Sequence, residues 1–419
     1  MPKDQSHFYE QKKPWSKVKD DLLGYYLTAY FQKILTTRKL VYYVDGFAGR
    51  GAFLDGTPGS PLIALRTAKA CLRRTHAPSR GILMTFIEAN LAADLERIVA
   101  QDMKAHSFPI AATVVPGRFE LETPQRLTSM AGGNVFLYID PFGIKDLDFG
   151  LITSFGSPTL GLHTVEVLMN LNSFGFIRAA CRAMKVKYEG DSTLVAPDDE
   201  FVDELEESAT PPSVELLDAI AGGTYWRPIV DDMKHHGLSG QDAELRFSNL
   251  YRDKLRETYR YVLSMPIRVA PGQPPKYRMV HATNHPHGCV WMADDMIKRK
   301  DDLYIYLPRH AQPMLLDTDI EGDATDADID KLASPVVDKL SGYTDVETFI
   351  ADFYSSVGVV CSSGAVRRSL KQAEAEGRIE VQRSPDRTPE GRPTAFFTTT
   401  KDQRVAIRPS GVGRDEHAS

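Results

Sequence analysis

Three apolar runs in the N-terminal third of the chain each end in a glycine-rich or acidic motif, and this repetition restricts the chain to few folds. LVYYVD (residues 40–45) continues into GFAGRG, ILMTFI (82–87) into Glu88, and NVFLYI (134–139) into Asp140-Pro141-Phe142-Gly143. Strands that alternate with helices predict βαβ units and a parallel sheet covered on both faces. Two further strands are predicted at 110–115 and 164–171, and helices at 15–37, 60–74 and 91–105.

The pattern becomes more helical after about residue 173. Helices are predicted at 199–221, 242–263 and 288–300, and strands at 264–269 and 277–283. We therefore expect one α/β, Rossmann-like domain over residues 1–310, with helical insertions in its second half.

An acidic segment divides this domain from a smaller one. Residues 317–330 (DTDIEGDATDADID) contain seven acidic residues and no basic one, as solvated linkers often do, and we assign 311–334 to an acidic linker. Helices at 344–356 and 363–376, followed by the strands IEVQR and TAFFTTT around a polar turn, have the order of a winged helix at 335–401. Residues 402–419 are expected to be a disordered tail.

Composition excludes several classes of protein. The 419 residues include 50 basic and 56 acidic side chains, a net charge of −6, so any nucleic-acid contact must come from a local basic patch. No apolar run approaches the ~18 residues of a membrane helix and the start lacks a signal-peptide core, so we expect a cytoplasmic protein without membrane contact. Four dispersed cysteines without a C-x-x-C pair exclude a cysteine zinc ribbon and an iron–sulfur cluster.

The motifs after the strands predict a nucleotide-like ligand, because ligands of open α/β sheets lie outside the carboxyl ends of the strands. Glycines without a Cβ let the backbone approach a ligand, and an acid after the second strand can accept hydrogen bonds from both ribose hydroxyls. Neither G-x-G-x-x-G nor a P-loop is present, so a nucleoside cofactor without pyrophosphate, S-adenosylmethionine, fits better. The predicted cofactor-binding residues are Asp45, Gly46, Phe47, Ala48, Gly49, Gly51, Glu88 and Phe119.

The D-P-F-G motif predicts the chemistry. Methyl transfer to an exocyclic amine requires the nitrogen lone pair to be aimed at the methyl group, which an Asp carboxylate and the backbone of a rigid turn can achieve. A neighbouring aromatic ring can stack on a flipped base. Asp140, Pro141 and Phe142 are therefore the predicted catalytic residues.

These motifs, DGFAGRG, IEAN and DPFG in this order, resemble those of class I S-adenosylmethionine-dependent methyltransferases. More closely, KPWSKVKDDLLGYYL, YVDGFAGRG, GSPLIAL, FIEAN, YIDPFG and ATNHPHG are similar to the three-Cys-motif partner (TcmP) family over roughly residues 8–300. That resemblance implies a methyltransferase domain and a three-Cys-motif protein as a partner. The first helix, strand and D-x-x-A-G-x-G are also similar to a ribosomal-RNA adenine-N6 methyltransferase, and D-P-F-G to tRNA guanine-N2 dimethyltransferases.

The sequence departs from these families at two places. Amino-methyltransferases usually carry D-P-P followed by an aromatic residue, whereas Phe142 stands third and Gly143 fourth here. VVPGRFE, after the third strand, lacks the acid that often contacts the adenine amine, which leaves Glu120 or a backbone group in that role.

Basic residues provide the candidate nucleic-acid contacts, with phosphates as their targets. They are Lys17 on the first helix, with Lys19 considered alongside it, Arg367, Arg368 and Lys371 on the second helix of the small domain, and Arg392 in the polar turn. His281, His285 and His287 lie close in sequence, but no carboxylate or H-E-x-x-H motif completes a metal site, so none is predicted.

The resulting hypothesis is methyl transfer from S-adenosylmethionine to an exocyclic amine of an RNA or DNA base. Two alternatives stay open. The acidic net charge favours a methyltransferase of a small molecule or a protein. The second is a non-catalytic scaffold that binds DNA or a protein partner through the winged helix, because winged helices also serve as protein-interaction modules.

Overall fold

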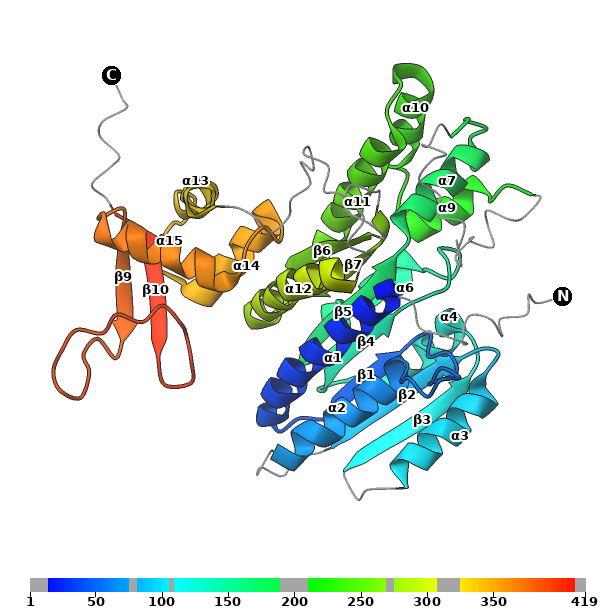
Figure 1. The fold of residues 1–419 in the computed structure, drawn as a ribbon, viewed down its shortest axis with the longest axis horizontal. Coiled ribbons are helices and arrows are strands. Elements are labelled where there is room, and N and C mark those ends of the chain that lie inside the picture. Colours follow the sequence, from blue (N-terminus) through cyan, green and yellow to red (C-terminus); the bar gives the residue numbers. More distant parts are fainter. Residues whose placement is uncertain are drawn as a thin grey trace. The chain divides into compact units, whose positions relative to one another are not determined.

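The computed structural model describes residues 14–74, 81–104, 109–188, 210–268, 275–306 and 325–410 (Figure 1). The chain divides into two compact units, residues 1–284 with 299–315, and residues 285–298 with 316–419. The first unit contains a seven-stranded sheet and the second a three-stranded sheet. Within the described ranges, no helix is long and apolar enough to cross a membrane.

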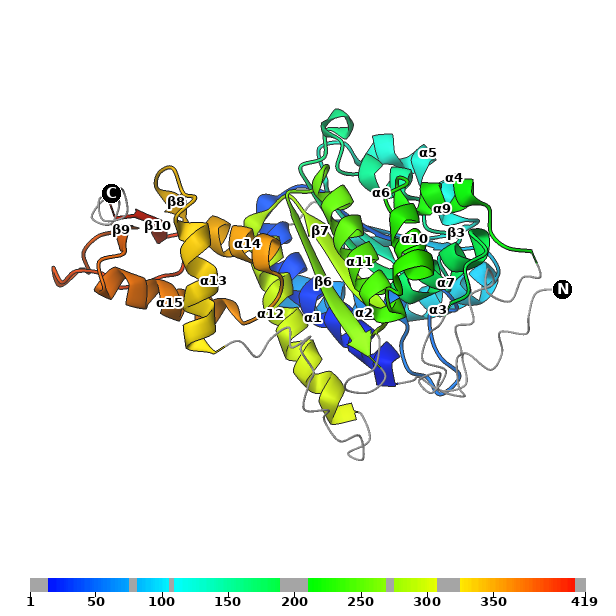
Figure 2. The same cartoon turned by 90° about the horizontal axis from the view of Figure 1, so that it is seen from above.

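The sheet of the first unit has the strand order β3-β2-β1-β4-β5-β7-β6. Strands β1 to β5 are parallel, whereas β7 runs antiparallel to both of its neighbours, and Figure 2 shows the long β6–β7 pair. The chain order reverses between β1 and β4, which is where doubly wound sheets open a ligand crevice. The bounds are Val41–Asp45 (β1), Ile82–Glu88 (β2), Ile110–Pro116 (β3), Asn134–Ile139 (β4), Thr164–Leu171 (β5), Tyr261–Arg268 (β6) and Pro275–Thr283 (β7).

Both faces of this sheet are buried, as the unbroken apolar runs predict. On β1, Tyr43 stacks on Phe136 of β4, and Phe136 contacts Tyr30 of helix α1 with ring centroids 5.1 Å apart. The adjacent Val44 belongs instead to a core cluster that includes Phe176 of α7. Successive side chains of a strand point to opposite faces, so helix α1 and helix α7 cover opposite sides.

The helices of the first unit connect and cover these strands (Figure 1). Helix α1 precedes β1 and packs against α2, which follows the glycine-rich loop. The bounds are Pro14–Ile34 (α1), Ser60–Arg74 (α2), Ala92–Met103 (α3), Phe119–Glu122 (α4), Pro124–Leu127 (α5), Phe149–Ser154 (α6), Ser173–Ala183 (α7), Val214–Ala221 (α9), Arg227–His236 (α10) and Gly240–Arg256 (α11).

The second unit has a core of helices against its small sheet, whose strand order is β8-β10-β9. Phe349 and Phe353 of α14, Leu370 of α15 and Ile407 of β10 are buried there. The bounds are Asp326–Val337 (α13), Thr344–Asp345 (β8), Val346–Val357 (α14), Ser363–Ala375 (α15), Ile379–Ser384 (β9) and Arg404–Pro409 (β10). Helix α12, Pro286–Tyr306, contributes residues to both units.

The structure corrects several predicted boundaries. Residues 285–298 group with the second unit rather than with a domain spanning 1–310. The predicted linker, 311–334, overlaps α13, because Thr325 forms a capping box with Asp328 and starts a helix inside the acidic run. The predicted helix 242–263 ends at Arg256, and Tyr261 already begins β6. The helical part predicted at 199–209 lies outside the described residues.

The second strand of the small hairpin was also predicted in the wrong place. TAFFTTT (394–400) forms no strand, and its carbonyl groups at Phe396 and Phe397 instead accept hydrogen bonds from Arg383 and Arg367. The strand is β10, within the predicted disordered tail 402–419, where the exposed Arg404 and Arg408 flank Val405 and Ile407, which point into the core. Of that tail, residues 411–419 lie outside the described part.

Candidate active site

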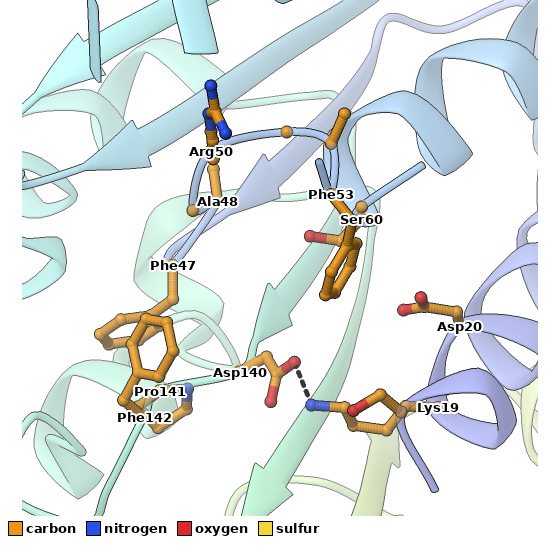
Figure 3. Close-up of a pocket in the computed structure, with 15 residues that line it drawn as sticks. Lys19, Asp20, Phe47, Ala48, Arg50, Phe53, Ser60, Asp140, Pro141 and Phe142 are labelled. Atoms are coloured by element: carbon orange, nitrogen blue, oxygen red, sulfur yellow. Dashed lines mark hydrogen bonds and ion pairs between the residues drawn. The ribbon is translucent and has the colours of Figure 1, made fainter. Parts of the chain in front are cut away.

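A cavity in the first unit lies at the carboxyl ends of β1 and β4, at the point where the strand order reverses (Figure 3). Three segments line it, the start of α1, the glycine-rich loop after β1, and the turn after β4. Its lining residues are Ser16, Lys19, Asp20, Phe47, Ala48, Gly49, Arg50, Gly51, Ala52, Phe53, Gly59, Ser60, Asp140, Pro141 and Phe142.

The cavity brings together all three predicted catalytic residues and half of the predicted cofactor-binding residues. Asp140, Pro141 and Phe142 face the loop residues Phe47, Ala48, Gly49 and Gly51. Asp45, Gly46, Glu88 and Phe119 do not line it. They lie behind the loop and determine its shape, as their contacts show.

Two glycines of the loop are required by close packing. A Cβ on Gly46 would lie 2.5 Å from the Phe119 ring, closer than Cβ atoms approach other atoms. Gly51 has a φ of +88°, and a Cβ there would lie 2.7 Å from Leu95 Cδ1. The loop is thus pressed against α3 and α4, with its backbone toward the cavity.

Asp45 anchors both ends of the loop from a fully buried position. Its Oδ1 accepts a hydrogen bond from the Phe47 amide at 3.2 Å, and its Oδ2 accepts one from the Ser60 hydroxyl at 2.7 Å. Burial, with smaller contributions from the charges of Asp140 and Glu88, raises the pKa of Asp45 to about 7 despite the lowering effect of the two hydrogen bonds.

Glu88 holds the loop and the start of α3 through backbone amides. Its Oε2 accepts from Gly49 N at 2.9 Å, and its Oε1 accepts from Asn90 N at 2.8 Å and Leu91 N at 3.1 Å. A carboxylate has about four lone-pair sites, so one remains for a ligand. A ribose contact would therefore have to share the Glu88 carboxylate with the three hydrogen bonds that hold the loop and the start of α3.

Asp140 accepts three hydrogen bonds from side chains. Lys19 Nζ lies 2.6 Å from Oδ2, Asn170 Nδ2 lies 2.9 Å from Oδ1, and the Tyr138 hydroxyl lies 3.3 Å from Oδ2. Lys19 is buried and its Nζ lies 5.4 Å from the centroid of the Tyr277 ring. In Figure 3, the Lys19–Asp140 pair lies on the other side of the cavity from the glycine-rich loop.

The side of the cavity away from Lys19 is apolar. Phe47, Pro141 and Phe142 lie together in Figure 3, on the side away from Lys19 and Asp20. Phe142 is 39% exposed, whereas Phe119 is buried and packs against Phe47 with ring centroids 5.5 Å apart. Phe119 therefore supports Phe47 instead of lining the cavity. Glu120, the candidate substitute for the missing acid, pairs with Arg118 at 2.6 Å and does not line the cavity either.

Tyr138 and Asn170 were not predicted to belong to the site, and Lys19 was considered only as a phosphate contact. A signal existed for Lys19, because it lies on the buried stripe of α1 with Val18, Leu22 and Tyr26, where a lysine needs an acidic partner. Asn170 is likewise a polar residue inside the buried strand TVEVLMNL.

The predicted nucleic-acid contacts separate into two groups. Lys17 is exposed and lines a second groove, between α1 and α2, while Arg368, Lys371 and Arg392 are exposed in the second unit. Arg367 is directed inward, where it donates to Glu347 Oε1 at 2.5 Å and to the Phe397 carbonyl at 2.9 Å. Arg367 is therefore a structural residue of the second unit.

The three histidines divide between the two units, and the rings of His285 and His287 stack with centroids 5.4 Å apart. His281 is buried on β7 with Nε2 3.2 Å from Glu166 Oε2, whereas His285 and His287 belong to the second unit. Among the residues that the structure describes, no group of three His, Cys, Asp or Glu side chains could hold a metal ion.

In comparisons with known proteins, no family model matches the chain and no curated protein matches it in sequence.

Proposed function

We propose that the protein transfers a methyl group from S-adenosylmethionine to an exocyclic amine of a nucleic-acid base. The observation that carries this proposal is a single cavity, at the switch point of a mostly parallel sheet, lined by both the glycine loop and Asp140-Pro141-Phe142. The order of motifs that resembles class I methyltransferases and the three-Cys-motif partner family is consistent with it.

The residues present fit this cofactor. Gly46 and Gly51 leave no room for side chains, so the loop offers its backbone to a ligand at Ala48 and Gly49. Glu88, with one lone-pair site free, would hold the ribose while its other bonds fix the loop and the start of α3. When bound, S-adenosylmethionine would supply an electrophilic methyl carbon, whose bond to the sulfonium would break to leave a neutral thioether as the amine nitrogen forms the new N–C bond.

Asp140 and its neighbours would orient the acceptor amine. Three donors occupy the Asp140 carboxylate, and about one lone-pair site remains for an amine hydrogen. Pro141 restricts the turn, and the exposed Phe142 ring offers an apolar face for a planar base. The amine loses one proton as it is methylated, and the Asp140 carboxylate is an acceptor for it in the cavity.

The second unit would supply nucleic-acid affinity as a winged helix. Its order of helices and strands, α13-β8-α14-α15-β9-β10 with a three-stranded sheet, supports that interpretation. Arg368 and Lys371, one helical turn apart on α15, and Arg392 are exposed and suited to phosphates. A three-Cys-motif protein is a further proposed partner, on the resemblance alone.

A methyl-transfer assay tests the proposal. Purified protein is incubated with methyl-labelled S-adenosylmethionine and with RNA, DNA or protein extract, and Asp140→Asn is compared with Asp253→Asn, an exposed acid on α11. We expect label in RNA or DNA from wild type and Asp253→Asn, and a loss of at least about 100-fold with Asp140→Asn. Label only in protein would favour the first alternative, and binding of S-adenosylmethionine without any transfer would favour the scaffold.

A further inference from the structure

The charges that line the cavity sum to zero. Its lining contains four charged side chains, the cations Lys19 and Arg50 and the anions Asp20 and Asp140. Arg50 also pairs with Asp94, with Nε 3.3 Å from Oδ2. At the D-P-F-G turn, the Lys19 ammonium, 2.6 Å from Oδ2, balances the Asp140 charge before any acceptor enters.

The Lys19–Asp140 pair is largely withdrawn from water. The Lys19 side chain is 8% exposed and that of Asp140 is 19% exposed, with 2.6 Å between Nζ and Oδ2. The Tyr277 ring beside Nζ adds a cation–π contact to the same ammonium. Displacing either partner of such a pair leaves an uncompensated buried charge, so the ammonium is expected to remain when an acceptor binds.

We propose that Lys19 determines which class of amine the site accepts, an inference that rests on the proposed function. By neutralising Asp140, Lys19 selects an uncharged aromatic amine and excludes an alkylammonium, such as a protein lysine or a small aliphatic amine. Alkylamines with a pKa near ~10 are cationic at neutral pH, and they would meet the Lys19 ammonium at Asp140.

A nucleobase amine can form hydrogen bonds with both members of the Lys19–Asp140 pair. Its N–H donates to the free lone-pair site of Asp140, and the ring nitrogen beside the amine can accept a hydrogen bond from Lys19, whose ammonium has three donors. The apolar side formed by Phe47, Pro141 and Phe142 suits the planar ring. Lys19 is thus a specificity-determining residue rather than a phosphate contact.

The test measures the charge at this subsite with known ligands, so no substrate has to be identified first. S-adenosylhomocysteine is neutral at sulfur, whereas sinefungin carries an ammonium group at the position of the transferable methyl. The ratio of the two Kd values, measured by calorimetry on the full chain, reports how the site treats a cation. The variants are Lys19→Met, Asp140→Asn, the double variant, and Lys33→Met as an exposed control on the same helix.

Opposite effects are expected from the two single variants. Lys19→Met should favour sinefungin over S-adenosylhomocysteine by roughly 10-fold relative to wild type, and Asp140→Asn should disfavour it by roughly 10-fold, since each leaves one charge unbalanced. The double variant and Lys33→Met should keep the wild-type ratio. The opposite shifts keep the test decisive even if one single variant fails to fold.

Two failures are distinguishable. If S-adenosylhomocysteine binds wild type and the folded variants, but the ratio changes less than twofold, the role of Lys19 is overturned while the proposed function stands. If folded wild type binds neither ligand, the proposed function itself fails.

Discussion

The Ser60 hydroxyl, at the first residue of α2, donates a 2.7 Å hydrogen bond to Asp45, at the last residue of β1. The two residues are 15 positions apart and close the glycine-rich loop at its base. Because Asp45 is fully buried, the loop that forms the candidate cofactor site is tied to a carboxyl group that resists ionisation.

This arrangement predicts a pH-dependent stability. The pKa of Asp45 is raised from 3.8 to about 7, so the folded state holds this proton more tightly than the unfolded state does. The contribution to stability is complete below about pH 4 and is lost as the pH rises through 7. Between these limits it falls by about 1.4 kcal/mol per pH unit.

Asp45→Asn removes the titration and keeps the shape of the side chain. The unfolding free energy of wild type minus that of Asp45→Asn should therefore decrease from pH 5 to pH 7, as measured by urea unfolding at several pH values. A difference that stays constant over this range would show that Asp45 is ionised in the folded protein.

Packing beneath the loop predicts the effect of Gly46→Ala. The new Cβ would lie 2.5 Å from the Phe119 ring, which is buried and packed against Phe47. We expect a loss of about 1–3 kcal/mol in the free energy of unfolding, the usual range for an overpacked core. Gly364→Ala, whose Cβ would have no neighbour closer than 3.8 Å, is the control and should cost less than about 0.5 kcal/mol.

A second variant separates overpacking from a backbone effect. Phe119→Leu should partly rescue Gly46→Ala, because the smaller side chain vacates the space that the Cβ needs. If the double variant is destabilised by the sum of the two single changes, the clash with Phe119 is not the cause.

The basic residues of α15 should differ in their effects on nucleic-acid binding and on stability. Arg368 and Lys371 are exposed, so replacing each with Ala should weaken binding to nucleic acid and reduce the salt slope by roughly one per residue, with stability unchanged. Arg367 is paired with Glu347, with a 17% exposed side chain, so Arg367→Ala should lower the thermal stability of the second unit.

Fluorescence anisotropy across a salt series, together with thermal melts, checks both expectations. An Arg367→Ala variant that melts like wild type but has a reduced salt slope would reverse these assignments. A salt slope near zero for wild type would remove nucleic acid as the partner of this unit.

The strand ends could be predicted from the sequence because each strand is a continuous apolar run with a clear polar stop. Asp45 and Asp140 were therefore assigned to one crevice, and the structure brings the segments that follow them around one cavity. The N-terminal helix was predicted to provide the phosphate contact Lys17, but its contact with Asp140 was not predicted, because helical periodicity identifies a buried face but not its partner. Lys19 meets Asp140 across 121 positions of sequence, a contact that only the packing of α1 on the sheet determines.

In the second unit, the local sequence pattern placed the last strand wrongly. Val405 and Ile407 carry a clear alternating strand pattern, yet charged neighbours and a position near the end of the sequence favoured a disordered tail. TAFFTTT has a high strand propensity but is held by Arg367 and Arg383 through its carbonyl groups. Tertiary contacts of single arginines decided this segment, and no local pattern reports them.

Calorimetric titration with S-adenosylmethionine and S-adenosylhomocysteine tests the central claim most directly. Wild type is compared with Glu88→Ala, which removes one hydrogen bond to the loop, two to the start of α3 and the proposed ribose contact, and with Glu96→Ala, an exposed acid on α3. We predict micromolar binding by wild type and Glu96→Ala, and a loss of at least about tenfold for Glu88→Ala. A folded wild-type protein that binds neither ligand at millimolar concentration would contradict the account.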